Sequence, residues 1–482
     1  MSRINTNVSS LIGQRVLNKN NEALNTSLQR LSTGLKINSG ADDPAGLIAS
    51  ENLKAEQTGI STAIDNANRA SNIIGTAEGG LSEVSSLLTQ LQGLVGQSAN
   101  SGGLSSEEVQ ANQLQVDSIL STINRIAGST SFQGKKLLNG NYDYTTSGVQ
   151  ASAFGDLHIN SARLPDGATQ SVVVSVTDSA TTGLVSFSGT QVATGGATIE
   201  VAGNAGTEQL SFASGTSAAD IATAVNSISE ATGVVASASA GGVAFKSNGY
   251  GSQQFVSIKK IAGTFAVADQ DGNNDGKDYG ADAKVNINGA AADVDGLDVT
   301  YRTNNLDVSF TLTTTDATNT TGGLNQGHTA TFGITGGGAT FALGSKVTET
   351  DKASIGIGSV STGSLGSLDT GFLSSLGSGG DNSLTSGNLV TAQKVIDKAI
   401  KQVSQLRGRL GAFQKFTIGS TINSLGVAYE NASAAESAIT DTDFAQETAN
   451  LTRNQILVQS ATTVLAQANS APQNALSLLR GG

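Results

Sequence analysis

The chain has 482 residues, no cysteine, no tryptophan, 59 glycines and only 4% aromatic residues. Its net charge of −12 is concentrated in residues 141–385, where 22 acidic residues face 9 basic ones, whereas both ends are close to neutral. The missing cysteines exclude disulfides and thiolate chemistry, the acidic middle disfavours nucleic acid and anionic membranes, and no run reaches the ~20 apolar residues of a membrane span. A chain with so few large apolar residues builds thin cores and depends on long local structure or on neighbours.

The first 140 residues carry helical patterns. A 4-3-4 spacing predicts one helix face formed by Leu24, Leu28, Leu31 and Leu35. Asp43 is a natural N-cap and Pro44 a natural first helical residue. A helix from Pro44 to about Asn100 would be roughly 85 Å long, and a third helix should follow the break at 101–103. Six glycines interrupt the long helix, at about 1 kcal/mol each relative to alanine, so these helices should depend on packing.

The last hundred residues mirror the first. Apolar stripes at helical spacing are Val403, Leu406, Leu410 and Phe413, then Leu425, Tyr429, Ala432, Glu436 and Ile439. Leu451, Val458 and Leu465 recur every seven residues, which favours lengthwise packing on another helix. Complementary stripes at the two ends predict a chain that folds back on itself.

The middle of the chain has a β pattern. Runs typical of strands, bounded by Gly, Asn and Asp turns, are 172–174, 198–201, 285–288 and 308–312. One helix is expected around Ala218–Ile228. Because fifteen of the twenty aromatic residues lie in this middle region, small β cores are feasible there. The predicted fold class is α+β, with a long helical coiled-coil rod formed by both chain ends and a β-rich central insertion.

Several stretches at both ends resemble bacterial flagellin. The N-terminal ones are Gln29–Asn38, Asp42–Gly46, Gln97–Asn100 and Phe132–Gly134. The C-terminal ones are Arg409–Ala412, Asp441–Ala445 with Glu447, Gln455–Leu457, Val464–Asn469, Pro472–Asn474 and Leu476–Arg480. The resemblance covers residues 1–150 and 386–482 in the family's order, and the segment Ser214–Ala238 is similar to the insertion motif of some flagellins.

This resemblance implies a subunit of the flagellar filament that serves swimming motility. It implies N- and C-terminal arms in the inner filament core at 1–43 and 441–482, two halves of a helical rod at 44–177 and 346–440, and an outer variable region at 178–345. It also implies partners: further copies of the chain in a helical filament, the flagellar export apparatus with an export chaperone, and hook-associated and cap proteins. The polar N-terminus lacks the apolar core of a secretory signal, so we expect export to the extracellular flagellum without a cleaved signal peptide. No nucleic acid, membrane insertion or cofactor is expected.

Residues that could carry chemistry are sparse. His158 and His328 lie 170 positions apart and outside any metal-spaced cluster. The best candidate is a calcium loop formed by Asp271, Asn273, Asp275 and, at position twelve, Asp282. Strand-like flanks and an aspartate in place of glutamate favour a solvated acidic turn there. We therefore expect no catalytic site and no enzyme, and we expect the assembly residues to be Leu24, Leu28, Leu31, Leu35, Leu451, Val458 and Leu465.

Three alternatives remain open at this point. A hook–filament junction protein would have similar ends, and a secreted β-rich adhesin would use the heptad-like ends only as stalks. An enzyme is the third. Electron microscopy after seeding separates these classes, because only a filament subunit gives long helical filaments.

Overall fold

The computed structural model describes residues 6–100, 103–164, 168–239, 241–270, 275–313, 327–368 and 370–480, with side chains as far as residue 471. The chain forms two compact units. The arm unit comprises Met1–Arg69, Ala342–Asp351 and Ile418–Gly482, and the central unit comprises Ala70–Phe341 and Lys352–Thr417. Helix α2 (Pro44–Ser98) contributes its first half to the arm unit and its second half to the central unit.

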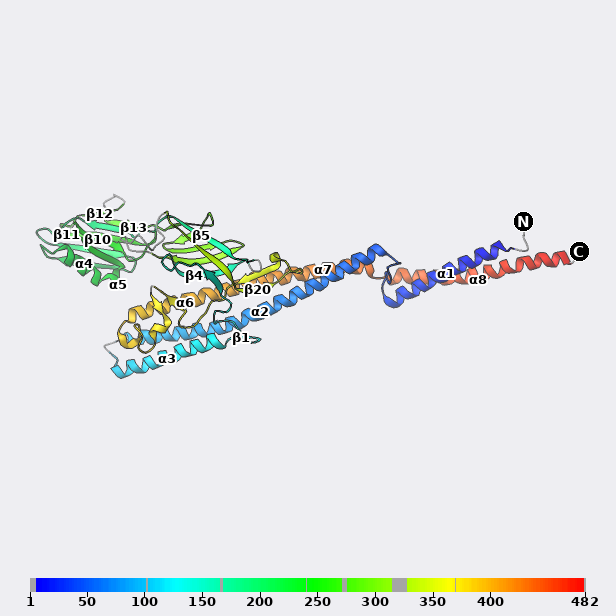
Figure 1. The fold of residues 1–482 in the computed structure, drawn as a ribbon, viewed down its shortest axis with the longest axis horizontal. Helices are drawn as coiled ribbons and strands as arrows, with labels where there is room; N and C mark the ends of the chain where they lie inside the picture. Colours follow the sequence, from blue (N-terminus) through cyan, green and yellow to red (C-terminus); the bar gives the residue numbers. More distant parts are fainter. Residues whose placement is uncertain are drawn as a thin grey trace. The chain divides into compact units, whose positions relative to one another are not determined.

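The arm unit is helical. It contains α1 (Val8–Thr33), the start of α2, α7 (Ser420–Thr440) and α8 (Phe444–Arg480). Helices α1 and α8 lie side by side (Figure 1). The predicted helix start is confirmed: α2 begins at Pro44, and the Asp43 carboxylate accepts a hydrogen bond from the Gly46 amide at 2.9 Å.

The helices of the central unit are the second half of α2, α3 (Ser106–Ser129) and α6 (Leu389–Ala412). Buried positions on α2 alternate in steps of three and four, which is the heptad pattern of a coiled-coil seam, and they are Ala70, Ile74, Ala77, Leu81, Val84, Leu88, Leu91 and Val95. Three polar contacts show that α6 and the residues after it run antiparallel to α2: Gln92 to Asp397 at 3.0 Å, Glu78 to Arg407 at 2.8 Å and, beyond the end of α6, Ser71 to Gln414 at 2.9 Å. A capping box of Ser105 and Glu108 starts α3, after the predicted break.

A π-helix, η4 (Phe413–Gly419), follows α6 and leads into α7. A π turn holds one residue more than an α turn. Buried Leu410 is therefore followed by buried Ile418 eight positions later, where a heptad gives seven. The same extra residue is present between the two apolar stripes in the sequence. Phe413, which ends the first stripe, and Leu425, which begins the second, are twelve positions apart, whereas heptad steps of four, three and four give eleven.

Two β sandwiches occupy the middle of the chain. In the first, a five-stranded sheet in the order β15-β14-β5-β19-β3 packs on a four-stranded sheet, β16-β17-β18-β4. The strands are β3 (Tyr144–Ser147), β4 (Phe154–Ala162), β5 (Gln170–Asp178), β14 (Lys284–Ile287), β15 (Ala290–Ala291), β16 (Asp293–Asp295), β17 (Asp298–Arg302), β18 (Leu306–Leu312) and β19 (Thr329–Gly337). Phe154 fills the core, edge-on to Phe310 and Phe332.

The second sandwich packs sheet β12-β6-β10-β9 on sheet β13-β11-β7-β8 with helix α4 (Ala218–Ser227) and the short α5 (Ser229–Thr232). Its strands are β6 (Leu184–Phe187), β7 (Ala197–Gly203), β8 (Thr207–Phe212), β9 (Val234–Ser239), β10 (Gly242–Ser247), β11 (Phe255–Gly263), β12 (Val267–Asp269) and β13 (Lys277–Tyr279). The chain segments that lead into and out of this sandwich pair with each other. Thr181 and Ala281 form an antiparallel bridge with backbone hydrogen bonds of 2.9 and 3.2 Å.

The predicted strands and the predicted helix near Ala218 are thus confirmed, and so is the α+β class. Short elements complete the chain: β1 (Ser131–Phe132), β2 (Lys135–Lys136), β20 (Ala339–Ala342), η1 (Glu349–Asp351), β21 (Lys352–Ile355), β22 (Gly366–Ser367), β23 (Gly371–Phe372), η2 (Leu373–Leu376) and η3 (Leu384–Ser386). Strands also occur inside the two ranges expected to form the helical rod, 44–177 and 346–440. None of the helices in the described part of the chain is long and apolar enough to cross a membrane.

Two glycines of α2 should respond in opposite ways to alanine. A Cβ at Gly80 would lie 2.8 Å from both Leu138 Cδ1 and Thr130 Oγ1, and Leu138 is fully buried. A Cβ at Gly93 would meet nothing within 4 Å. Overpacking costs roughly 1–3 kcal/mol, whereas removing a helical glycine stabilises by about 1 kcal/mol. Gly93→Ala should raise the helical melting temperature measured by circular dichroism, and Gly80→Ala should lower it or leave it unchanged. An equal rise in both variants would contradict the close packing at Gly80.

Candidate assembly interface

The two ends of the chain pair along a heptad seam. On α1 the positions facing inward are spaced by three and four: Ser10, Gly13, Leu17, Asn20, Leu24, Ser27 and Leu31. On α8 the matching set is Leu451, Asn454, Val458, Ala461, Leu465 and Ala468. Most of these side chains are half-buried, and Gly13, Ser27 and Ala461 are buried. The seam is therefore a regular coiled coil with small and polar residues at many core positions.

Small residues let the two helices approach closely. A Cβ added to Gly13 would lie 3.1 Å from Leu465 Cδ1. Asparagine side chains then fix the register: Asn7 donates to the Ala468 carbonyl at 2.8 Å, Asn20 to the Leu457 carbonyl at 3.3 Å, and Asn454 to the Ser27 hydroxyl at 3.2 Å. Polar groups at coiled-coil core positions set register at some cost in stability.

At the end of the seam where α1 ends and α8 begins, the segments that connect these helices to α2 and α7 pair with each other. Gly34 ends α1 with a left-handed φ of 76°, and its carbonyl accepts from the Thr442 amide at 2.9 Å. The Lys36 amide donates to the Thr440 carbonyl at 2.6 Å, and Leu35 bridges Asp441. The turn between α1 and α2 thus runs alongside the turn between α7 and α8.

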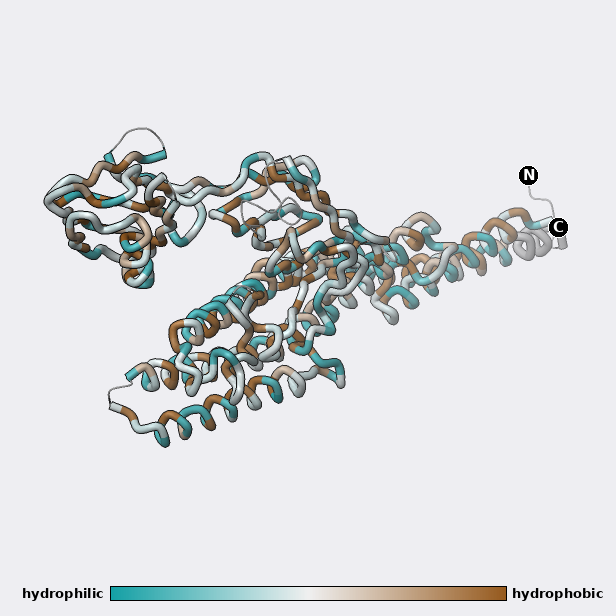
Figure 2. The backbone as a smooth tube through the Cα atoms, turned by 60° about the vertical axis from the view of Figure 1, so that its left-hand side comes forward, coloured by the Kyte–Doolittle hydropathy of each residue, from teal (hydrophilic) through white to brown (hydrophobic). Residues whose placement is uncertain are grey.

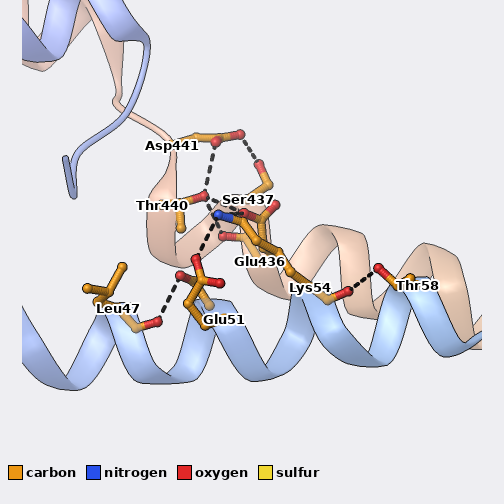
Figure 3. A network of polar contacts seen from close by, with 9 residues as sticks. Leu47, Glu51, Lys54, Thr58, Glu436, Ser437, Thr440 and Asp441 are labelled. Carbon is orange, nitrogen blue, oxygen red and sulfur yellow. Dashed lines mark hydrogen bonds and ion pairs between the residues drawn. The ribbon is translucent and has the colours of Figure 1, made fainter. Parts of the chain in front are cut away.

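Charged side chains surround the place where these two turns lie alongside each other. Figure 3 shows Lys54 of α2 between Glu51, at 3.4 Å, and Glu436 of α7, at 4.0 Å. The Ser437 hydroxyl donates to the Asp441 carboxylate at 2.6 Å. Nearby, the Ser39 and Asn38 amides and the Ser39 hydroxyl donate to Asp42 and lower the pKa of its carboxyl. The two turns are joined by polar contacts, and Thr440, which accepts from the Lys36 amide, is buried.

A second apolar face of the arm pair lies uncovered. Ile12, Val16, Leu457 and Val464 are 49%, 42%, 42% and 61% exposed. Together with Ser9 and Ser460 they line a cleft of about 440 Å³ between α1 and α8. Val8, Leu11 and Ile456 add to the exposed apolar area, and brown apolar segments recur along α1 (Figure 2). Exposed apolar surface on this scale marks a surface that binds a partner.

The predicted assembly residues fall into two groups. Leu24, Leu31, Leu451, Val458 and Leu465 are half-buried at seam positions. Leu28 and Leu35 lie off the seam, 47% and 36% exposed, and Leu35 follows the end of α1. Burial within one chain does not measure polymer contacts, so the assembly role of all seven stays a prediction.

Gly13, Leu17, Asn20 and Ser27 are seam residues that the sequence reasoning missed. The signal was a seven-residue repeat of Leu17, Leu24 and Leu31, which matches the spacing of Leu451, Val458 and Leu465. A search for leucine at helical spacing selected Leu28 and Leu35 instead, because it gave no weight to glycine, serine and asparagine as coiled-coil core residues.

Two members of the predicted calcium loop, Asp271 and Asn273, lie outside the described residues. Asp282 accepts hydrogen bonds from the Ser252 hydroxyl and amide and from the Gly296 amide, which lower the pKa of its carboxyl. Asp275 accepts from the Lys277 amide at 2.8 Å. The Asp275 carboxylate thus closes a local turn, and the Asp282 carboxylate ties together segments that are 14 and 30 residues away. Among the residues that the structure describes, no three His, Cys, Asp or Glu side chains are grouped to hold a metal ion.

His158 lies on β4, and desolvation lowers the pKa of its imidazole, whereas the nearby Asp143 and Asp156 carboxylates raise it.

A chain whose ends close into a thin, partly uncovered coiled coil, and whose middle folds into separate sandwiches, has the features of a self-assembling structural subunit. Comparison with known families gives the same result. Residues 4–143 match the bacterial flagellin N-terminal helical region, 393–479 the C-terminal helical region, and 198–249 the flagellin hook IN motif. The last match includes the segment Ser214–Ala238, where the insertion motif was predicted.

Relatives of full length agree. The chain is 30% identical over 480 residues to polar flagellin C of Vibrio parahaemolyticus and 31% identical over 477 residues to flagellin A of Vibrio anguillarum, and each alignment covers 99% of both chains. The chain belongs to the bacterial flagellin family, and it is a structural subunit of the flagellar filament. The junction-protein and adhesin alternatives have no better support.

Among solved structures, FliC from Burkholderia pseudomallei is 17% identical, with 72% of this chain and 99% of that chain covered and a TM-score of 0.24. So low a score adds no argument to the assignment.

The seam predicts the outcome of one charge substitution. Val458→Asp places a carboxylate between α1 and α8, and burying it unpaired costs on the order of 2 kcal/mol or more. Because every copy in a polymer repeats this cost, sedimentation after seeding should show no filament. Gln459→Asp changes the neighbouring exposed residue and should pellet normally. Equal pelleting of the two variants would remove Val458 from the seam.

Proposed function

We propose that this chain polymerises through the uncovered face of its arm pair. The seam holds α1 and α8 together within one copy, and the face around Ile12, Val16, Leu457 and Val464 binds the arms of neighbouring copies. The observation that carries this proposal is an uncovered aliphatic face directly beside the seam, whose residues Gly13, Asn20 and Ala461 also line the cleft. The seam uses one set of heptad positions on each helix, and four large aliphatic side chains stand on another set with no cover in the described chain. A monomer that stayed single would expose this surface to water at a cost of ~25 cal/mol per Å².

The remaining assignments follow from the same arrangement. We infer that residues 1–43 and 441–482 form the inner filament core, that the ranges 44–177 and 346–440 supply the rod, and that 178–345 faces outward. Export in an unfolded state, through the flagellar export apparatus with a chaperone and without a cleaved signal peptide, suits a chain with no cysteine and thin, reversible packing. Hook-associated and cap proteins would contact the ends of the filament, outside the cell. The role is structural, with no catalytic step.

The outer face can be tested without disturbing the seam. In Val16→Ser with Val464→Ser, two aliphatic side chains leave the uncovered face while the seam contacts of Asn7, Asn20 and Asn454 remain. Losing them from an interface costs roughly 2–3 kcal/mol per copy, so the critical concentration for polymerisation should rise at least tenfold. Sedimentation of seeded protein measures this concentration.

The matched control changes two exposed polar residues of the same helices, Gln14→Ser with Gln467→Ser. It should polymerise as the unmodified chain does. Unchanged circular dichroism of both monomers shows that the seam is intact. If the valine variant polymerises at the unmodified concentration, the uncovered face is not the polymer contact.

The second sandwich should be dispensable for polymerisation. Thr181 and Ala281 are already paired, so excising residues 182–280 with a two- or three-residue glycine–serine turn leaves the first sandwich and its core unbroken. The core of the excised part is a separate cluster that includes Phe187, Ile221 and Phe245. Electron microscopy of the shortened chain should show filaments. A folded product that stays monomeric would assign an assembly role to this sandwich.

A further inference from the structure

The two sandwiches of the central unit have separate apolar cores. One core contains Phe154 and Phe332, and the other contains Phe187 and Phe245. The chain passes between the sandwiches twice, through the segments around residues 181 and 281. Two modules that share no large apolar interface move relative to each other by default. A fixed orientation of one sandwich on the other must therefore come from contacts between these connecting segments and the loops beside them.

Backbone hydrogen bonds join both connecting segments to the loop 248–254, which leads from β10 to β11 in the second sandwich. The Thr181 carbonyl accepts from the Ala281 amide at 3.2 Å and from the Gly251 amide at 3.1 Å. The Gly280 amide donates to the Gln254 carbonyl at 2.9 Å. The loop is thus bonded to both segments on which the second sandwich is carried.

The Asp282 carboxylate joins the same loop to the first sandwich. Its Oδ1 accepts from the Ser252 amide at 2.9 Å and from the Gly296 amide at 2.8 Å, and its Oδ2 accepts from the Ser252 hydroxyl at 2.5 Å. Ser252 belongs to the second sandwich, whereas Gly296 lies in the turn between β16 and β17 of the first. These donors lower the pKa of the Asp282 carboxyl, so it is ionised at neutral pH and its hydrogen bonds are charge-assisted.

The loop and the turn meet backbone to backbone. A Cβ added to Gly251 would lie 2.7 Å from the Gly296 Cα, and a Cβ added to Gly296 would lie 2.5 Å from the Tyr250 carbonyl oxygen. Both glycines are buried and have positive φ, 113° for Gly251 and 62° for Gly296. Contact this close leaves the loop no room to slide across the turn.

A second contact of the second sandwich lies elsewhere. Lys394 of α6 donates to Glu230 of α5 at 3.2 Å, and the two side chains are 50% and 66% exposed. An exposed ion pair contributes little to stability and is screened by salt. This pair can add to a fixed orientation, but it cannot set one.

We propose that Asp282 fixes the orientation of the second sandwich on the first, through a rigid junction formed with Gly251, Ser252 and Gly296. The second sandwich then does not swing on its two connecting segments. As a consequence, every copy in a polymer presents the same face of this sandwich to the surroundings. Only this consequence rests on the proposed outward placement of residues 178–345, because the junction itself belongs to the single chain.

Two nitroxide labels test the junction in the full-length monomer. The chain has no cysteine, so Ser171→Cys on β5 and Lys260→Cys on β11, both at exposed positions, place one label on each sandwich. Pulsed electron paramagnetic resonance gives the distribution of distances between the labels. It should be narrow in the otherwise unmodified chain, and it should stay narrow at high salt. In Asp282→Ala it should broaden about twofold, because the two backbone amides lose their shared acceptor.

Three further variants separate the junction from a general loss of structure. Asp295→Ala removes an exposed carboxylate beside the same turn and should leave the distribution narrow. Asp282→Asn keeps an oxygen that can accept from both amides and should stay close to the unmodified width. Gly251→Ala forces a Cβ against Gly296 and should broaden the distribution as Asp282→Ala does. Circular dichroism of each variant shows that both sandwiches remain folded.

Two results would overturn the proposal. One is the same width in Asp282→Ala as in the unmodified chain, and the other is a broadening at high salt alone that equals the effect of Asp282→Ala. Neither result bears on polymerisation through the arms, which is measured separately by sedimentation.

Discussion

The antiparallel contact of α2 with α6 is the constraint on which the rest of the structure depends. Ser71 and Gln414 lie 2.9 Å apart, so two points separated by more than 340 residues leave the central unit next to each other. Closing a flexible loop of the 410 residues between α1 and α8 would cost about 5 kcal/mol, which a seam of glycine, serine, asparagine and alanine could not supply. Because the central unit has already brought the chain together, the two arms need only find each other over short tethers.

The seam itself is weak by composition. Gly13 brings the helices close, but it contributes no apolar area, and Ser27 and Asn20 replace aliphatic contacts with hydrogen bonds. Weak pairing within one copy leaves the aliphatic face around Val16 and Val464 uncovered, and covering it with other copies is the source of free energy that the proposed polymerisation uses. Under the proposed polymerisation, the same composition would make the arms marginal alone and stable once neighbouring copies cover this face.

The sequence predicted those elements whose signals are local. Asp43 and Pro44 marked a helix start through capping chemistry, and the β runs at 172–174 and 308–312 stood between turn residues. The π-helix was not predicted, because one extra residue in a turn appears in the sequence only as a slip in stripe phase between Phe413 and Leu425. Hydrogen bonds from side-chain amides to the backbone of other segments were also not predicted. They involve Gln113, Asn124, Asn226 and Gln402. Nothing in the neighbouring sequence distinguishes these residues from solvated amides. In the candidate interface, apolar spacing located Leu24, Leu31, Leu451, Val458 and Leu465 of the seam, and the small residues that set its geometry carried too little apolar signal to be recognised.

The bridge between Thr181 and Ala281 has a consequence for how such a chain can change over generations. A module that leaves and returns through adjacent residues of one ladder can be exchanged, enlarged or lost by a single recombination event, and the sandwich beneath it keeps every strand. In the proposed arrangement, mutations in that module would be screened only for its own folding and for what it presents to the surroundings, while the arms would stay under selection for packing against identical copies. One gene could in this way vary the surface of a fibre quickly while its interior stays almost fixed.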